Sequence, residues 1–216
     1  MNFTTILSSL TSGMGVSIYI FIITLVFSLP LGLLVAFARM SKNPVLSVFS
    51  KVYISIMRGT PLMLQLMVVY FGPYYIFGIK VSNGYRLWAA LIGFIINYAA
   101  YFAEIYRSGI QSMPVGQYEA AQLLGYSKFQ TFRVIILPQV IKRILPSIAN
   151  EVITLVKDTS LAFTISVAEM FSTAKALASS TTSMMPFVAA ALFYYIFNFL
   201  VAALMDYTEK KMDYYK

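Results

Sequence analysis

The sequence predicts an all-α integral membrane protein with five transmembrane helices, and three observations support this prediction. Of the 216 residues, 59% are hydrophobic and 11% are charged. Several apolar runs approach or exceed the length of about 20 residues that crosses a bilayer. A charged and periodic stretch, residues 114–146, separates two of these runs and is too polar to be a span. We therefore expect residues 1–216 to form a single membrane domain.

The first span is expected at residues 14–38. Thr24, Ser28, Gly32 and Ala36 recur every four residues and place small side chains on one face of this helix. Such a stripe allows a second helix to approach closely in a membrane. We therefore expect this span to be packed against another helix along that face.

A short second span is expected at residues 61–77, after an amphipathic segment at 45–58. In the amphipathic segment, the apolar residues share one face of a helix and the polar residues share another. This pattern suits an interfacial helix or a water-exposed extension of the span. Thr60 and Pro61 are typical of an N-cap followed by proline at the first helical position. The sequence thus predicts a helix start at this dipeptide.

Three further spans complete the predicted domain. Residues 87–106 form the third, residues 147–171 the fourth and residues 185–206 the fifth, while the Ser- and Thr-rich residues 172–184 are expected to form a loop. The fourth span is the least apolar of the five. Residues 107–146 are then a connection between the third and fourth spans.

The centre of that connection predicts two short helices at the water boundary. Pro114 can begin the first helix and Gly125 ends it. Ser127 and Gln130 have the spacing of a capping box that starts the second helix. Large apolar residues fall on one face of this second helix, namely Phe129, Phe132 and Ile136. Two such short helices cannot bury these side chains alone, so they need the rest of the chain and a partner.

The distribution of basic residues predicts the orientation. Twelve Lys and Arg flank the 39–58 turn, the 107–146 connection and the C-terminal tail, whereas three lie in the opposite loops. The twelve are Arg39, Lys42, Lys51, Arg58, Arg107, Lys128, Arg133, Lys142, Arg143, Lys210, Lys211 and Lys216, and the three are Lys80, Arg86 and Lys175. Because basic loops stay in the cytoplasm, the connection and the C-terminus are expected inside and the N-terminus outside.

The composition argues against several functional classes. The chain has no cysteine and no histidine, which removes thiol metal sites and the commonest general base. It contains no P-loop motif and no nucleophile–base set, so neither a nucleotide site nor an enzyme is expected. No catalytic or metal-binding residues are predicted. The net charge of +8 is explained by cytoplasmic loops rather than by nucleic-acid binding.

Polar residues within the spans are the candidates for a translocation path. Asn97, Tyr101 and Glu104 follow one face of the third span. Ionisable groups in a span are costly and usually face a protein interior or a wet cavity, although ion pairs between helices or snorkelling to the headgroups are alternatives. The full candidate set is Gln65, Asn97, Tyr98, Tyr101, Glu104, Lys157, Asp158, Ser160 and Glu169.

Two motifs resemble a known family. The first motif begins with Glu119-Ala120-Ala121, and Gly125 follows after three residues, Ile135 after nine more and Leu137-Pro138 after one more. This spacing is similar to the cytoplasmic loop signature of ABC importer permeases. The segment from Arg58 to Leu66, RGTPLMLQL, resembles a motif of the branch that carries polar amino acids. In this family the loop is a coupling helix that docks in a groove of the ATPase subunit. The resemblance therefore assigns ATPase coupling to Glu119, Ala120, Ala121 and Gly125.

The resemblance also implies the setting of the protein. It implies a type I ABC importer permease fold in a bacterial cytoplasmic membrane and a path for a polar amino acid. The expected partners are an ABC ATPase, an extracytoplasmic amino-acid-binding protein and a second permease chain, identical or different. No cofactor is expected on this chain, and ATP and Mg belong to the ATPase. The alternatives are a stand-alone secondary carrier or channel for a small polar solute and a membrane assembly factor without a ligand.

The orientation can be tested with single cysteines, because the chain contains none. A cysteine introduced at Gln130 should be protected from an impermeant thiol reagent added outside intact cells, whereas one at Asn83 should react. Labelling is measured by a mass shift of the purified protein. Reaction at position 130 with protection at position 83 would reverse the predicted orientation.

Overall fold

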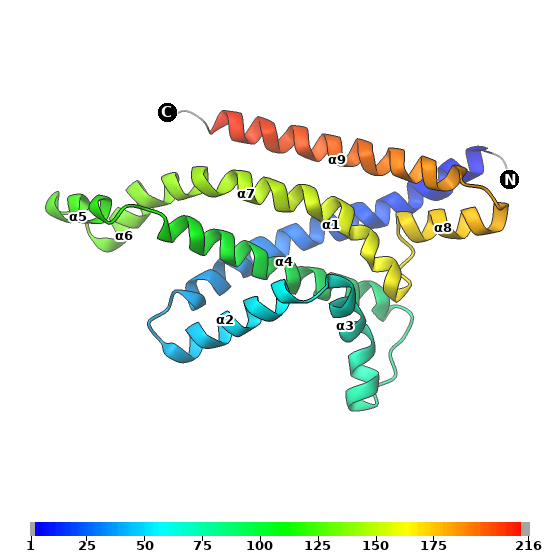
Figure 1. The fold of residues 1–216 in the computed structure, drawn as a ribbon, viewed down its shortest axis with the longest axis horizontal. Helices are drawn as coiled ribbons and strands as arrows, with labels where there is room; N and C mark the ends of the chain where they lie inside the picture. Colours follow the sequence, from blue (N-terminus) through cyan, green and yellow to red (C-terminus); the bar gives the residue numbers. More distant parts are fainter. Residues whose placement is uncertain (1–2, 213–216) are drawn as a thin grey trace.

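The computed structural model describes residues 3–212, and within this range the chain is helical with no strand. Lys216, counted above with the cytoplasmic residues, lies outside the described residues. Four long helices run along the longest axis of the molecule (Figure 1). They are α1 (Phe3–Arg39), α4 (Tyr85–Gln111), α7 (Leu137–Asp158) and α9 (Met185–Lys211). Short α5 (Val115–Leu123) and α6 (Lys128–Gln130) lie at one end, and α8 (Met170–Thr181) lies at the other, near the N-terminus.

The number of spans is smaller than the sequence predicts. Among the described residues, α1, α4 and α9 are long and apolar enough to cross a membrane. The pair α2 (Pro44–Gly59) and α3 (Leu62–Phe77) meets the same requirement when taken together, but it is bent by 110°. By length and composition the described chain therefore has three spans, or four when the bent pair is one span.

The expected fourth span, 147–171, is not one helix. α7 ends at Asp158 and is followed by a 3-10 helix, Thr159–Ile165. Ser166 then adopts a left-handed backbone with φ of 60°, which ends the helical run. α7 fails as a span because of its charged residues, which are Lys142, Arg143, Glu151, Lys157 and Asp158.

The boundaries of the two expected connections also differ from the structure. Most of the expected loop 172–184 is helix α8, because Glu169 caps its first turn with a side-chain carboxylate. The 107–146 connection is shorter than expected, since α4 continues to Gln111 and α7 begins at Leu137. A π-helical turn, Thr131–Ile136, leads into α7.

The stripe of small residues on α1 packs against α4, as the sequence predicts. Thr24, Ser28 and Ala36 have no exposed surface. A Cβ atom built on Gly32 would lie 2.8 Å from the Cβ of Phe102 and 3.0 Å from the carbonyl oxygen of Ala99. The two backbones are therefore in direct contact, and α1 and α4 form the most extensive helix pair of the described chain.

The helix α3 leaves the bundle and projects from it (Figure 1). Of the residues described in this helix, Leu66 alone is buried. Thr60 does not act as the expected N-cap, because its hydroxyl donates a hydrogen bond back to the carbonyl of Ile56 at the end of α2. Pro61 occupies the cap position without a side-chain bond. The dipeptide thus makes the bend rather than a capped helix start.

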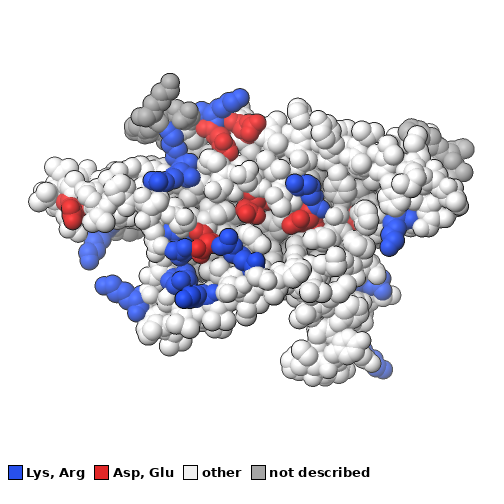
Figure 2. All heavy atoms as spheres, viewed as in Figure 1, with Lys and Arg blue, Asp and Glu red and all other residues white. Residues whose placement is uncertain are grey.

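Charged side chains are unevenly distributed over the visible face. Figure 2 shows most Lys and Arg toward the half of the molecule that carries α5, the start of α2 and the end of α9, with fewer at the opposite end. Some acidic groups lie near the middle of the same face, and others lie among the basic groups of that half. The structure therefore keeps the basic residues of the predicted cytoplasmic side together at one end.

The contact at Gly32 predicts a large effect of a single methyl group. Gly32→Ala should lower the free energy of unfolding by about 1–3 kcal/mol, because the backbone of α4 must move to make room. Gly15→Ala in the same helix is the control, since no atom outside the nearby turns of α1 lies within 4 Å of its added Cβ. It should be neutral or stabilising by about 0.5–1 kcal/mol. Thermal denaturation in detergent compares the two variants, and equal stability would contradict the packing.

Candidate functional site

A polar cavity of about 510 Å³ lies between the end of α2, the second half of α4 and the first half of α7. Tyr101 and Glu104 on α4, and Ser147 and Glu151 on α7, line it with helical spacing. The two helices therefore turn their polar faces toward each other. The complete lining is Arg58, Tyr101, Glu104, Ile105, Ser108, Gly109, Ser112, Arg143, Ile144, Ser147 and Glu151.

The cavity holds both positive and negative groups. The guanidinium of Arg58 lies 5.4 Å from the ring centroid of Tyr101, a cation–π contact. Glu104 forms an ion pair with Arg107, whose Nε donates to the second carboxylate oxygen at 3.0 Å. Glu151 reaches the cavity from α7 and is half-buried. An ammonium and a carboxylate of one small molecule could both find partners here.

Sequence reasoning identified part of this cavity. Tyr101 and Glu104 were candidates because they share a face of a mostly apolar helix. Arg58, Arg143 and Ser147 were not, because they lie in segments that the sequence assigns to loops or helix ends. The helical spacing of Arg143, Ser147 and Glu151 on one face of α7 is the signal that could have identified them.

Gln65 and Asn97 are held in a different environment. The Gln65 amide donates to the carbonyl of Met57 at 3.0 Å and to the hydroxyl of Thr60 at 2.8 Å. The Asn97 amide donates to Gln65 at 2.9 Å and to Met57 at 3.2 Å, and only 4% of Asn97 is exposed. Both side chains thus bind protein groups at the bend between α2 and α3.

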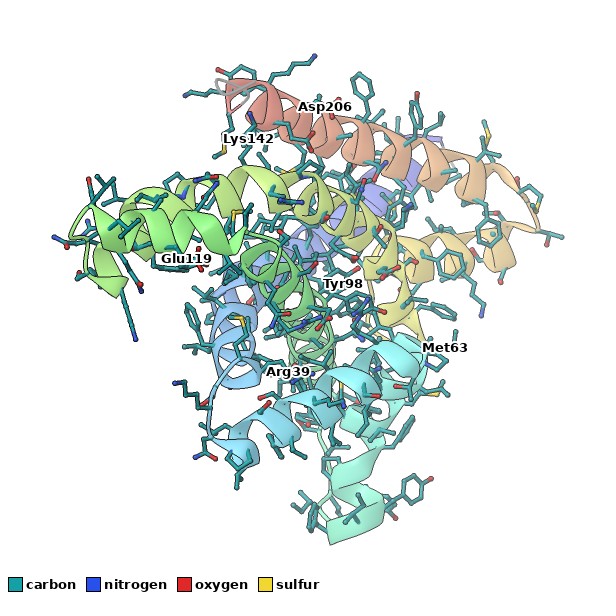
Figure 3. All side chains as sticks on the ribbon, turned by 60° about the vertical axis from the view of Figure 1, so that its left-hand side comes forward. Arg39, Met63, Tyr98, Glu119, Lys142 and Asp206 are labelled. Carbon is teal, nitrogen blue, oxygen red and sulfur yellow. The ribbon has the colours of Figure 1, made fainter. Side chains whose placement is uncertain are left out.

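Tyr98 and Asp158 form a hydrogen bond in the interior. The hydroxyl of Tyr98 donates to Asp158 Oδ2 at 2.8 Å and joins α4 to the end of α7. Figure 3 places Tyr98 in the middle of the bundle. Lys157 and Ser160 instead line a separate cavity of about 320 Å³ between α7, α8 and α9. The residues 157–160 therefore do not act as one cluster.

Glu169 is fully buried and bonded on all sides. Its carboxylate accepts from the backbone N–H groups of Phe171 and Ser172 at 2.7 Å each. The hydroxyls of Tyr194, at 3.0 Å, and Ser17, at 3.4 Å, complete the shell. Glu169 thus links α1, α8 and α9, and its oxygens are occupied by protein donors.

The short helices at the other end expose apolar surface. α5 carries Glu119 and Ala120 on its exposed side and Ala121 on its buried side. Figure 3 shows Glu119 at the end of the molecule, far from Tyr98. Gly125 follows with a left-handed backbone, φ of 82°, and the helix ends before it as the sequence predicts. The side chain of Leu123 is 90% exposed beside it.

The second short helix begins as the sequence predicts but then changes its periodicity. Ser127 and Gln130 form the predicted capping box, with hydrogen bonds in both directions. The π-helical turn that follows alters the spacing of side chains, so Phe129 is exposed while Ile136 is buried in the contact between α4 and α7. Phe129, Phe132 and Ile136 therefore do not share one face, contrary to the expectation from the sequence.

Comparison with known proteins places the chain among membrane transport components. A family model described as binding-protein-dependent transport system inner membrane component matches residues 28–214. The probable amino-acid permease protein YxeN of Bacillus subtilis is 38% identical over 206 residues, covering 95% of this chain and 92% of that protein. The putative glutamine transport system permease protein GlnP of Rickettsia conorii is 36% identical over 204 residues, covering 94% and 92%.

Two solved structures share the fold. The crystal structure of an amino acid ABC transporter with histidines superposes with a TM-score of 0.87 at 29% identity, covering 98% of this chain and 99% of that chain. The MetNI methionine ABC transporter in an inward-facing conformation has a TM-score of 0.70 at 16% identity, covering 98% and 99%. The second similarity concerns the fold alone.

Glu169 and Glu151 should respond differently to substitution. Glu169→Ala should lower the free energy of unfolding by about 1–3 kcal/mol, because it removes a helix cap and leaves buried donors unpaired. Glu151→Ala should leave stability nearly unchanged, since its side chain faces a cavity. Thermal denaturation of both variants in the same detergent is the measurement. A destabilised Glu151→Ala beside an unaffected Glu169→Ala would reverse the assignment.

Proposed function

The chain belongs to the family of binding-protein-dependent transport system inner membrane components, and from this we propose that it is the membrane-spanning subunit of an ATP-driven importer for a polar amino acid. The observation that carries this proposal is the polar cavity between α2, α4 and α7 in a chain built of apolar helices. Polar cavities among membrane helices are where substrate paths are found. The amino-acid permeases among its relatives support the class of substrate.

The lining of the cavity fits a zwitterion. Arg58 and Arg143 offer cationic groups for a carboxylate, while Glu151 offers a carboxylate for an ammonium. Both carboxylate oxygens of Glu104 are already bonded to Arg107. A single chain leaves this polar wall uncovered on one side, and apolar lipid would be a poor cover for it. A second permease chain would close the path, either as an identical copy or as a related subunit.

Coupling to ATP hydrolysis is proposed for the end that carries α5 and α6. The exposed apolar side chains at this end, Leu123 and Phe129 among them, suit a helix that enters a groove on another protein. We assign this contact to Glu119, Ala120 and Gly125, with Ala121 on the buried side of the same helix, and place ATP and Mg on a separate ATPase chain. An extracytoplasmic amino-acid-binding protein would deliver the substrate from the opposite end, where the N-terminus lies outside the cell.

Reconstitution tests the proposal. The purified complex of this chain with its ATPase is placed in proteoliposomes, and uptake of radiolabelled L-glutamine, L-arginine, L-histidine and L-cystine is measured with ATP inside and binding protein outside. We expect ATP-dependent uptake of at least one of the four. Uptake that persists without ATP but follows an ion gradient would favour a secondary carrier, and no uptake with no bound ATPase would favour an assembly factor.

A pair of substitutions at Gly125 tests the docking surface. Asp and Asn have similar size and both tolerate a left-handed backbone, so they differ mainly in charge. Apart from Gly125 and its two neighbours in the chain, no residue of the described chain has an atom within 4 Å of a Cβ at this position. Gly125→Asp should therefore insert normally but reduce substrate-stimulated ATP hydrolysis about tenfold or more, because a charge is desolvated in the groove.

The matched control is Gly125→Asn, which should retain most of the stimulation. The measurement is ATPase activity with and without substrate and binding protein, together with the abundance of each variant in the membrane. Full stimulation of the Gly125→Asp complex at normal abundance would remove this loop from the coupling mechanism.

A further inference from the structure

The bend between α2 and α3 is held by two side-chain amides. The Gln65 Nε2 atom donates to the carbonyl oxygens of Met57, at 3.0 Å, and Thr60, at 3.1 Å, and to the Thr60 hydroxyl at 2.8 Å. The Asn97 Nδ2 atom reaches across from α4 to Met57 and to the Gln65 carbonyl oxygen. Three segments, the end of α2, the start of α3 and the middle of α4, thus meet in one hydrogen-bonded cluster.

This cluster meets a need created by the bend. The last carbonyl groups of a helix have no partners within that helix, and α2 ends at Gly59 because Pro61 follows. Unpaired carbonyls are costly where little water reaches them. The amides of Gln65 and Asn97 supply donors to these carbonyls, and Asn97 also ties them to α4.

Arg58 follows Met57, whose carbonyl oxygen accepts hydrogen bonds from both amides. Its guanidinium lies over the ring of Tyr101, which is one helical turn beyond Asn97 on the same face of α4. Consecutive residues of α2, Met57 and Arg58, are therefore bound by consecutive turns of α4. Tyr53 adds a further link, because its hydroxyl donates to the carbonyl oxygen of Ile96.

We propose that Asn97 and Gln65 are positioning residues, which hold the α2 backbone so that Arg58 faces Glu104 and Glu151 in the cavity. Neither amide belongs to the described lining of that cavity. Substrate affinity would thus depend on two side chains that do not touch the substrate. This inference rests on the proposed function, because it assigns Arg58 to the proposed substrate path.

The first test requires no substrate. In the Arg58→Cys variant, the introduced thiol is the only one in the chain, and its reaction rate with a positively charged, water-soluble methanethiosulfonate reagent is measured on the purified complex. Adding Asn97→Leu or Gln65→Leu should raise the rate about threefold to tenfold, because each removes hydrogen bonds that restrain the backbone at position 57.

The control for this labelling is Asn43→Ala. Asn43 caps the opposite end of α2, where its side chain accepts from the Val45 N–H at 2.9 Å. Its loss weakens the same helix without touching Met57, so the rate at position 58 should stay unchanged. Equal rates in all backgrounds, or an equal increase with Asn43→Ala, would overturn the inference.

The second test is a double-mutant cycle on uptake of the transported amino acid from the four-member panel. Asn97→Leu alone should raise KM about fivefold to tenfold with a smaller change in maximal rate. In an Arg58→Ala background the same substitution should add little, because the residue through which it acts is already absent. An equal factor in both backgrounds would show a general structural role instead.

The two hypotheses fail in different ways. If the unmodified complex takes up none of the four amino acids, the proposed function fails, while the labelling result still reports on the hydrogen-bonded cluster of Gln65 and Asn97. If uptake is normal and Asn97→Leu changes neither labelling nor KM, the positioning role fails and the proposed function stands. Abundance and thermal stability of every variant are measured beside both tests.

Discussion

Polar groups placed among apolar helices are costly unless they find partners within the protein, and the polar contacts between the helices follow from that constraint. The helix α4 shows it most clearly, because its polar side chains meet different partners along its length. Asn97 binds the bend between α2 and α3, Tyr98 binds Asp158 at the end of α7, and Glu104 binds Arg107 in its own next turn. On its opposite side, α4 packs against α1 with the two backbones in direct contact. The helix α4 therefore connects the bundle core to the polar cavity.

The same constraint separates structural polar groups from those available to a ligand. Glu169 has four protein donors around its carboxylate and no exposed surface, so it serves the junction of α1, α8 and α9. Arg58 and Glu151 reach a cavity that the chain leaves open. The presence of an ionisable residue in a membrane helix therefore does not distinguish a structural role from ligand binding. The hydrogen-bond partners of that residue distinguish the two roles.

The two ends of the molecule are suited to different tasks. The end with α5 and α6 exposes apolar side chains beside a glycine with a left-handed backbone, and it carries little buried core of its own. The middle contains the cavity, and the bent pair α2 and α3 brings Arg58 to its wall. The helix α7 connects the two regions, because it follows the π-helical turn beside α6 and contributes residues to the lining of the cavity.

Local sequence determined the elements whose cause is local. The apolar runs of α1, α4 and α9, the capping box of Ser127 and Gln130 and the left-handed Gly125 each depend on residues within a few turns, so their helices and turns were predictable. The tertiary structure decided which polar groups are paired. Asn97 and Tyr101 lie on one face of one helix, yet the first meets Met57 and the second meets Arg58 beside a cavity. Helical periodicity specifies a shared face but not the element that packs against it. Glu169 shows the same limit, because two of its partners, Ser17 and Tyr194, lie far from it in the sequence.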